Sequence, residues 1–551
     1  MTSQYYDLGT YSRPVTTASR DAQLWFDRGL VWTYGFNHEE AVRCFEKAVE
    51  ADPDCAMAFW GIAYSLGPNY NKPWEDFEEN ELSSTVARAF HATNEAVRLS
   101  EGSTLIERAI IGTLPARYPS ITPAADYSVW NLDYVDRLRQ VYREHPADLD
   151  VATLFADALM LLTPWALWDQ ATGEPAAGSR TVEAVHVLET ALLSPAANEH
   201  PGVLHMYVHL LEMSSQPERA MDAGEKLALT APDAGHLVHM LSHIDVLCGD
   251  YERALDSNSA AIIADEKFVL REGPVNFYTL YRAHNYHFKI YAAMFLGQSE
   301  IALRTADELA RSVPEELLRI ESPPMANWLE GFVSMRVHVL IRFGKWQEII
   351  ELELPDDHEL YCVTTAMLHY GKSVACSATG RIAEAEEQKQ LFDSALGRVP
   401  ASRTLFNNTC LDILKVAEEM LDGELEYRKA NYDSAFAHLR RSVELYDSLP
   451  YDEPWGWMQP ARHALGALLL EQGHTEEAEA VYRADLGLDD TLARANQHPN
   501  NVWSLHGYHE CLERLGKTAE ADALAPQLEK AVSRADVPVK SSCACRMSQV
   551  P

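Results

Sequence analysis

The stretch that decides the fold is WFDRGLVWTYGFNHEEAVRCFEKAVEADP, residues 25–53. Gly29 and Ala41 are small residues, placed where the two helices of a hairpin would cross closely, and the ring of Phe45 is spaced to fill the gap beside them. Pro53 then ends the second helix, because proline cannot continue a helix. The stretch therefore predicts a tightly packed pair of helices.

The same spacing of a small residue and a proline recurs along the chain. Ala220 and Pro232 stand twelve residues apart, as do Ala302 and Pro314, and the interval matches that in the first hairpin. Apolar residues spaced three and four apart continue to near Asp536, and no stretch carries the alternating pattern of a long strand. We therefore expect an all-α chain in which helical hairpins stack in order.

The hairpin pattern divides the chain into six segments. They are an N-terminal extension, regular hairpins, irregular hairpins, a histidine-rich array, a C-terminal array and an extended tail, at residues 1–20, 21–73, 74–200, 201–320, 321–536 and 537–551. Within the irregular part, TPWALWDQATGEPAAGS at 163–179 is a long loop rich in proline and glycine. A loop of that length inside a compact array is more often functional or mobile than merely connecting.

Histidines gather in the fourth segment. Eight of the 21 histidines lie between residues 200 and 287. His205 and His239 are 34 residues apart, as are His209 and His243, so these side chains recur at equivalent places of successive hairpins. Spacings of three and four place neighbouring side chains on one helical face.

The first hairpin resembles a tetratricopeptide repeat, whose length is 34 residues. HPG.LHMYVH, DAGHLVHMLSHI, DPDCAMAFWGIA, HPNN.WSLHG and SSCACR further resemble a group of uncharacterised bacterial and fungal proteins with histidine-rich repeats of this kind. The resemblance implies a right-handed α-solenoid, a superhelix whose concave face is lined by the first helix of each repeat. It implies no particular activity.

In peptide-binding members of that family, the second, fifth, ninth and twelfth places of the first helix face the groove. Carried onto this chain, those places hold seven histidines on three neighbouring helices. They are His205, His209, His236, His239, His243, His284 and His287. A single histidine on a helix is usually a core or surface residue, but seven together would repel one another on protonation, and a metal ion that needs neutral imidazoles removes that conflict.

The cluster therefore predicts a transition-metal site in the concave channel. Imidazole ligands favour copper or zinc, with iron a further candidate, over calcium and magnesium. Glu212, Asp233 and Asp245 are candidates for an added carboxylate ligand or for orienting the histidines.

Two functions of different classes follow. In the first, the chain is a metal-dependent oxidoreductase or hydrolase acting on a small molecule, with Glu212 or Tyr291 as the acid or base. In the second, it is an adaptor whose groove binds a partner peptide. The groove helices from Val203 to Glu212 and from Gly235 to Asp245 contain no Lys or Arg, which disfavours a clamp for a peptide carboxylate.

Composition limits the partners. The net charge is −36, so a nucleic acid or an anionic membrane surface is a poor partner. The sequence has no apolar signal segment or spanning segment, which predicts a cytoplasmic protein. The nine cysteines show no framework spacing and are expected to be mostly reduced, with Cys543 and Cys545 as bystanders in the tail.

Overall fold

The first hairpin forms as its sequence predicts. In the computed structural model, which describes residues 5–549, it consists of α1 (Arg20–Tyr34) and α2 (His38–Ala51). Ser19 and Asn37 cap the two helices by accepting hydrogen bonds from the backbone N–H groups of Ala22 and Glu40. Both caps satisfy backbone donors that the first turn of a helix leaves without a partner.

Close packing around Phe45 holds this hairpin to the next helix, α3 (Ala56–Leu66). A Cβ atom added to Gly29 would lie 2.7 Å from the Phe45 ring, and one added to Gly61 would lie 2.5 Å from it. Phe45 itself is fully buried. The ring therefore fits only because a glycine stands on each side of it.

The chain divides into two compact units. Unit 1 comprises the residues up to Ile244 together with Ile263–Tyr278. Unit 2 comprises Asp245–Ile262 and the chain from Thr279 onwards. The division falls inside the histidine-rich segment, at a place that the hairpin pattern does not mark.

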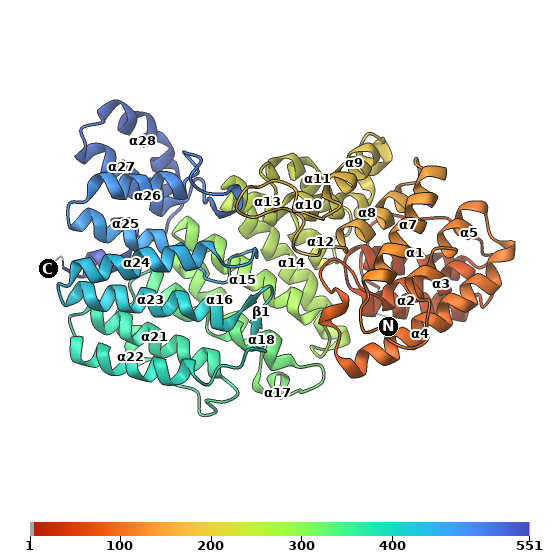
Figure 1. Ribbon diagram of the computed structural model, residues 1–551, viewed down its shortest axis with the longest axis horizontal. Helices are drawn as coiled ribbons and strands as arrows, with labels where there is room; N and C mark the ends of the chain where they lie inside the picture. The colour runs from red at the N-terminus through yellow and green to blue at the C-terminus, as the bar shows by residue number, and fades with distance from the viewer. Residues whose placement is uncertain (1–4, 550–551) are drawn as a thin grey trace. The chain divides into compact units, whose positions relative to one another are not determined.

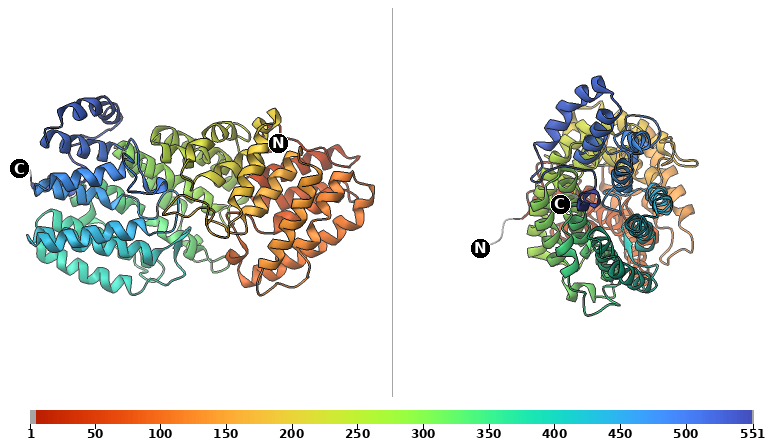
Figure 2. Two further views of the ribbon diagram at one scale, coloured as in Figure 1. Left: turned by 45° about the horizontal axis from the view of Figure 1, so that its top comes forward. Right: turned by 90° about the vertical axis from the view of Figure 1, so that its left-hand side faces the viewer.

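Unit 1 is built from helices that pack mainly on their sequence neighbours, and Figure 2 shows α1 to α4 running side by side. After α3 its elements are η1 (Trp74–Asp76), α4 (Glu79–Leu99), η2 (Ser100–Gly102), α5 (Leu105–Ile111), α6 (Leu114–Arg117), α7 (Ser128–Glu144), α8 (Leu149–Met160), α9 (Thr181–Leu192), η3 (Pro195–Glu199), α10 (Pro201–Leu211), η4 (Pro217–Ala220), α11 (Met221–Leu227) and α12 (Gly235–His239). α10 departs from the neighbour rule in one useful way, because it packs against both α8 and α1.

Two helices carry the chain across the division between the units, namely α13 (Leu241–Cys248) and α14 (Tyr251–Glu272). The interval from His236 to His284, and from His239 to His287, is 48 residues in place of 34, so the sequence predicts fourteen extra residues near this point. α14 accounts for part of them by its length of 22 residues.

Unit 2 continues the pattern of successive hairpins, which Figure 1 shows for α21 to α28. Its elements are α15 (Thr279–Leu296), α16 (Ser299–Ser312), α17 (Glu315–Leu318), α18 (Met325–Val333), α19 (Met335–Arg342), α20 (Trp346–Glu351), α21 (Cys362–Ala378), α22 (Ile382–Leu396), β1 (Thr404–Leu405), β2 (Asn408–Thr409), α23 (Cys410–Arg428), α24 (Tyr432–Asp447), α25 (Ala461–Glu471), α26 (Thr475–Asp485), η5 (Arg494–Asn496), α27 (Val502–Arg514), α28 (Thr518–Val532) and η6 (Ala544–Gln549).

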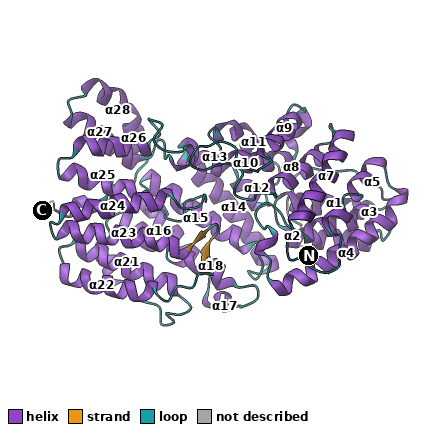
Figure 3. Ribbon diagram, in the orientation of Figure 1, coloured by secondary structure: helices purple, strands orange, loops and turns teal. Residues whose placement is uncertain are grey.

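The fold class is all-α, a solenoid of helical hairpins, as predicted. Among residues 5–549 the named strands are only β1 and β2, which form one short antiparallel pair (Figure 3). None of the helices in the described part of the chain is long and apolar enough to cross a membrane.

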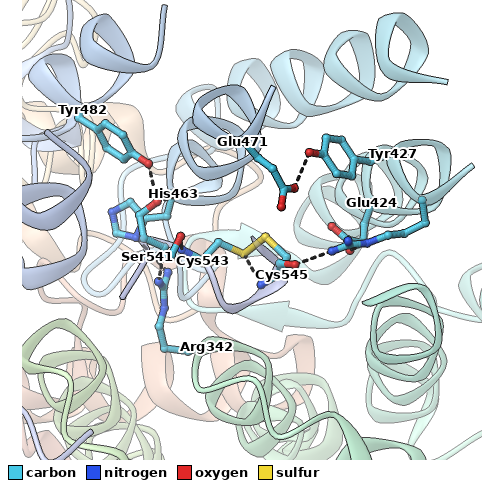
Figure 4. Close-up of a disulfide and its surroundings, with 11 residues drawn as sticks. Arg342, Glu424, Tyr427, His463, Glu471, Tyr482, Ser541, Cys543 and Cys545 are labelled. Carbon is cyan, nitrogen blue, oxygen red and sulfur yellow. Dashed lines mark hydrogen bonds and ion pairs between the residues drawn. A yellow bond between two sulfur atoms is a disulfide. The ribbon is translucent and has the colours of Figure 1, made fainter. Parts of the chain in front are cut away.

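The C-terminal tail differs from the extended end that its lack of periodicity predicts. Ser541 and Ser542 are buried, and Arg342 donates a hydrogen bond of 2.7 Å to the backbone carbonyl of Ser542. Cys543 and Cys545 are joined by a disulfide against the core of unit 2, as Figure 4 shows. The expectation fails because polar contacts from other helices order this segment, and a periodicity test within the segment cannot detect them.

The packing around Phe45 yields a first prediction. Gly29→Ala should lower the free energy of unfolding by about 1–3 kcal/mol, because the new methyl group overpacks the Phe45 ring, although alanine favours a helix more than glycine does. Denaturant unfolding followed by circular dichroism measures the change.

Gly102→Ala is the matched control, since an added Cβ at Gly102 meets no atom within 4 Å. The double variant Gly29→Ala, Phe45→Leu should have a higher free energy of unfolding than Phe45→Leu alone, because the smaller leucine leaves room for the added methyl group. Equal stability of Gly29→Ala and wild type would contradict this account of the packing.

Candidate metal centre

Five of the seven predicted histidines come together in unit 1. α10 provides His205 and His209, α12 provides His236 and His239, and α13 provides His243. All five side chains are buried, with exposed fractions between 0% and 3%. The repeat spacing in the sequence thus predicts the residues that unit 1 gathers.

The rings form a continuous cluster. The centroids of the His205 and His209 rings are 4.7 Å apart, and those of His205 and His236 are 4.9 Å apart. His236 lies 5.5 Å from His239, which in turn lies 4.7 Å from His243. Each ring therefore has another imidazole as an immediate neighbour.

Three of the rings are held by their Nδ1 atoms. His205 Nδ1 donates to the backbone carbonyl of Tyr34 at 2.6 Å. His209 Nδ1 and His243 Nδ1 donate to the two carboxylate oxygens of Glu212, at 3.0 Å and 2.6 Å. A neutral imidazole that donates from Nδ1 presents a lone pair at Nε2. This is how oxygen acceptors around a metal site fix the tautomer of the histidine ligands.

The Nε2 atoms converge on one another. His205 Nε2 lies 3.1 Å from His236 Nε2, and His239 Nε2 lies 2.9 Å from His243 Nε2. His209 Nε2 is buried without a hydrogen-bond partner. One ligand atom from each of His205, His209 and His236 lies within 4.8 Å of the others. This group can hold a metal ion with modest adjustment of the rings.

Burial keeps these imidazoles neutral. Loss of hydration lowers the pKa of His205, His209 and His236 well below the usual value, and neighbouring imidazoles lower the pKa of all three further. Burial also raises the pKa of Glu212, although His243 opposes that rise. A cluster of neutral imidazoles is in the protonation state that metal ligation needs.

Aromatic rings close the cluster on one side. The Phe36 ring lies 4.6 Å from the His205 ring and 5.7 Å from those of His209 and His236. Phe36 occupies the turn between α1 and α2 with φ +56°, a left-handed conformation that is uncommon for an aromatic residue. The first hairpin therefore supplies both an oxygen acceptor, from Tyr34, and a ring of the wall.

The long loop at residues 163–179 covers another side. The ring centroid of Trp165 lies 5.9 Å from that of His209 and 5.0 Å from that of Tyr70. The ring centroids of Tyr70 and His209 are 5.2 Å apart. Trp168 donates a hydrogen bond of 2.6 Å to the backbone carbonyl of Leu210 in α10. The loop that composition marks as unusual is thus attached to the histidine-bearing helix.

The remaining predicted site residues belong to unit 2 or form ion pairs. His284, His287 and Tyr291 belong to α15 in unit 2. Asp233 pairs with Lys267 and accepts a hydrogen bond from the backbone of Asp7. Asp245 belongs to unit 2 and pairs with Arg253. These contacts engage both aspartates with groups other than the five histidines.

Unit 2 holds a polar cluster that sequence reasoning did not find. Asp485, fully buried, accepts hydrogen bonds from His463 at 3.0 Å and His498 at 2.9 Å. Asn501 and Ser504 donate to the same carboxylate, at 3.0 Å and 2.6 Å. The residues come from three helices and a loop, so no repeat interval joins them. The HPNN stretch at residues 498–501 contains His498 and Asn501, but no spacing rule connects it to Asp485.

The comparisons with known proteins agree with the hairpin pattern. The family model described as tetratricopeptide repeat matches residues 22–55. No curated protein matches the chain.

Solved structures align over most of the chain at low similarity. One is the Cut9–Hcn1 hetero-tetramer of the APC/C, with 12% identity and a TM-score of 0.30 over 94% of this chain and 76% of that chain. Yeast Tom70 has 11% identity and a TM-score of 0.31 over 92% of this chain and 99% of that chain. The human IFIT1 dimer with m7Gppp-AAAA has 11% identity and a TM-score of 0.34 over 94% of this chain and 92% of that chain. None of these superpositions is close enough to support a conclusion about function.

The burial of histidine in unit 2 gives a prediction for pH. Loss of hydration lowers the pKa of His338 to about 3, whereas an unfolded histidine titrates near about 6.5. The unfolded chain therefore binds one more proton than the folded chain between these values, so stability falls as the pH drops below about 6.5. His338 alone should cost about 2 kcal/mol of unfolding free energy between pH 7 and pH 5.

The measurement compares wild type with His338→Gln by denaturant unfolding at pH 7, 6 and 5. The variant should lose less stability over this range than wild type, by about the amount assigned to His338. Parallel pH dependences for the two proteins would show that His338 is protonated in the folded state or that unit 2 does not unfold in the measured transition.

Proposed function

We propose that this chain is a helical-repeat scaffold that holds a transition-metal ion in unit 1. The observation that carries the proposal is the arrangement of His205, His209 and His236, buried together with Nε2 atoms of the first and third 3.1 Å apart. Two nitrogens bound to one ion at about 2.0–2.1 Å lie about 2.9–3.4 Å apart when they occupy neighbouring corners of a square or tetrahedron. The 3.1 Å separation falls in that range.

Ligand chemistry favours copper or zinc. The three donors are imidazole nitrogens, which suit zinc, copper, iron and nickel better than calcium or magnesium. No cysteine contributes to the group within the described residues. The Nδ1 contacts of His205 and His209 support the role, because they leave Nε2 as the ligand atom.

The proposal is binding rather than catalysis. Glu212 uses one carboxylate oxygen for His209 and the other for His243. Of the two roles that the sequence suggests for Glu212, these contacts support orienting the histidines over acid–base catalysis. Tyr291 lies in unit 2, where burial first and then Asp485 raise its pKa well above the usual value. A hydroxyl with that pKa is a poor base near neutral pH.

A second candidate is an adaptor that binds a partner peptide. The repeat at residues 22–55 favours it, because arrays of this repeat commonly bind peptides along their helices. The two candidates are compatible, since the metal can serve to rigidify unit 1. The metal test below decides whether the adaptor role stands alone.

We expect purified protein without a histidine tag to retain copper or zinc after dialysis against a weak chelator, or to rebind it when reloaded. His205→Ala combined with His236→Ala should abolish retention at this group, because it removes two of the three ligands. Elemental analysis by mass spectrometry gives the number of ions per chain.

His186→Ala is the matched control, because His186 is an exposed histidine of α9 in the same unit. Retention that falls equally in the control would point to nonspecific surface binding. A wild type that neither retains nor rebinds these metals would remove the proposal and leave the adaptor.

A further inference from the structure

A second pair of imidazoles in unit 1 has the geometry of the first. His239 Nε2 and His243 Nε2 are 2.9 Å apart, and both side chains are buried. That separation also matches neighbouring positions on one ion with bonds of about 2.0–2.1 Å. The pair spans the junction where α12 ends at His239 and α13 begins at Leu241.

One carboxylate connects the two groups. Glu212 is fully buried at the C-terminal end of α10. Its Oε1 holds His209 of the first group at 3.0 Å, and its Oε2 holds His243 of the second pair at 2.6 Å. Both bonds go to Nδ1, so both rings present Nε2 lone pairs. Glu212 thus prepares one ligand atom on each side.

The five imidazoles fall into two groups. Ligand atoms of His205, His209 and His236 lie within 4.8 Å of one another, and those of His239 and His243 belong to a separate set of neighbouring ligand atoms. His209 and His243 each turn Nδ1 to Glu212, so each presents Nε2 to its own group. The two groups are therefore distinct candidate centres.

We propose that unit 1 binds two transition-metal ions, one at His205, His209 and His236 and a second at His239 and His243, with Glu212 orienting a ligand of each. The inference rests on the proposed metal-binding function for its first ion and goes beyond it in the second. The pair supplies two of the second ion's ligands. The carboxylate also places a negative charge between two cations in a buried site.

The test is the stoichiometry of Zn²⁺ binding by the full chain, titrated against a chromophoric chelator and confirmed by elemental analysis. Wild type should bind two ions per chain. His239→Asn with His243→Asn should bind one, His205→Asn with His236→Asn should bind one, and the exposed-site control His186→Asn should bind two. Circular dichroism melting curves verify that each variant is folded.

Glu212→Gln gives an independent readout. An amide offers one acceptor oxygen in place of two, so it can keep only one of the two Nδ1 contacts. Zn²⁺ affinity should fall about 10–100-fold, as it does when an orienting carboxylate is lost. A purely structural role for Glu212 would lower the melting temperature of the metal-free protein and leave both Zn²⁺ affinities unchanged.

The outcomes separate the two proposals. One ion per chain, lost with His205→Asn and His236→Asn and unaffected by the other pair, would keep the proposed function and overturn the second site. In that case His239 and His243 are a hydrogen-bonded pair only. No bound ion in wild type would overturn both. If a double variant fails to fold, the wild-type stoichiometry and the Glu212→Gln titration still decide the question.

Discussion

The centre of unit 1 depends on the requirement that buried polar groups have partners. Glu212 is completely excluded from solvent, and an unpaired carboxylate there would cost several kcal/mol. Its two oxygens accept from His209 and His243, which belong to different helical hairpins. The same bonds that satisfy the carboxylate set the tautomers of both rings. Stability and ligand chemistry therefore rest on one side chain.

That arrangement requires several elements to meet on α10. Packing of α10 against α1 brings the backbone carbonyl of Tyr34 to His205 and the ring of Phe36 over three imidazoles. The loop carrying Trp165 covers His209 from another direction. Apolar rings around the cluster remove water, which keeps the imidazoles neutral and strengthens each polar contact. The first repeat is thus part of the site as well as the start of the fold.

The all-α class and the gathering of five of the seven predicted histidines in unit 1 follow from the same sequence feature. A repeat interval of 34 residues places His205 and His239, and likewise His209 and His243, at equivalent positions, so packing of successive hairpins brings them together. The partners of those rings were less predictable. Tyr34 contributes a backbone carbonyl, which every residue has, and Phe36 acts through an unusual turn conformation that no spacing rule reveals. The prediction of an extended tail was wrong for a similar reason, because the contacts that order the tail come from helices distant in sequence.

Asp485 in unit 2 is surrounded by the same residue types as the proposed ligand site in unit 1, but in a purely structural arrangement. His463 and His498 each bind Asp485 through one nitrogen, and the other nitrogen of each ring is engaged by Arg342 or by Tyr446. Every ring nitrogen there is used within the protein. Burial raises the pKa of Asp485, but His463 and His498 together hold it well below the usual value. In unit 1, His209 Nδ1 donates a hydrogen bond to Glu212, whereas His209 Nε2 is buried without a hydrogen-bond partner. A buried nitrogen lone pair without a partner destabilises the fold, and ligation of a cation by that lone pair would offset the cost. The difference in how the rings are satisfied, rather than the number of histidines, is what distinguishes the centre in unit 1.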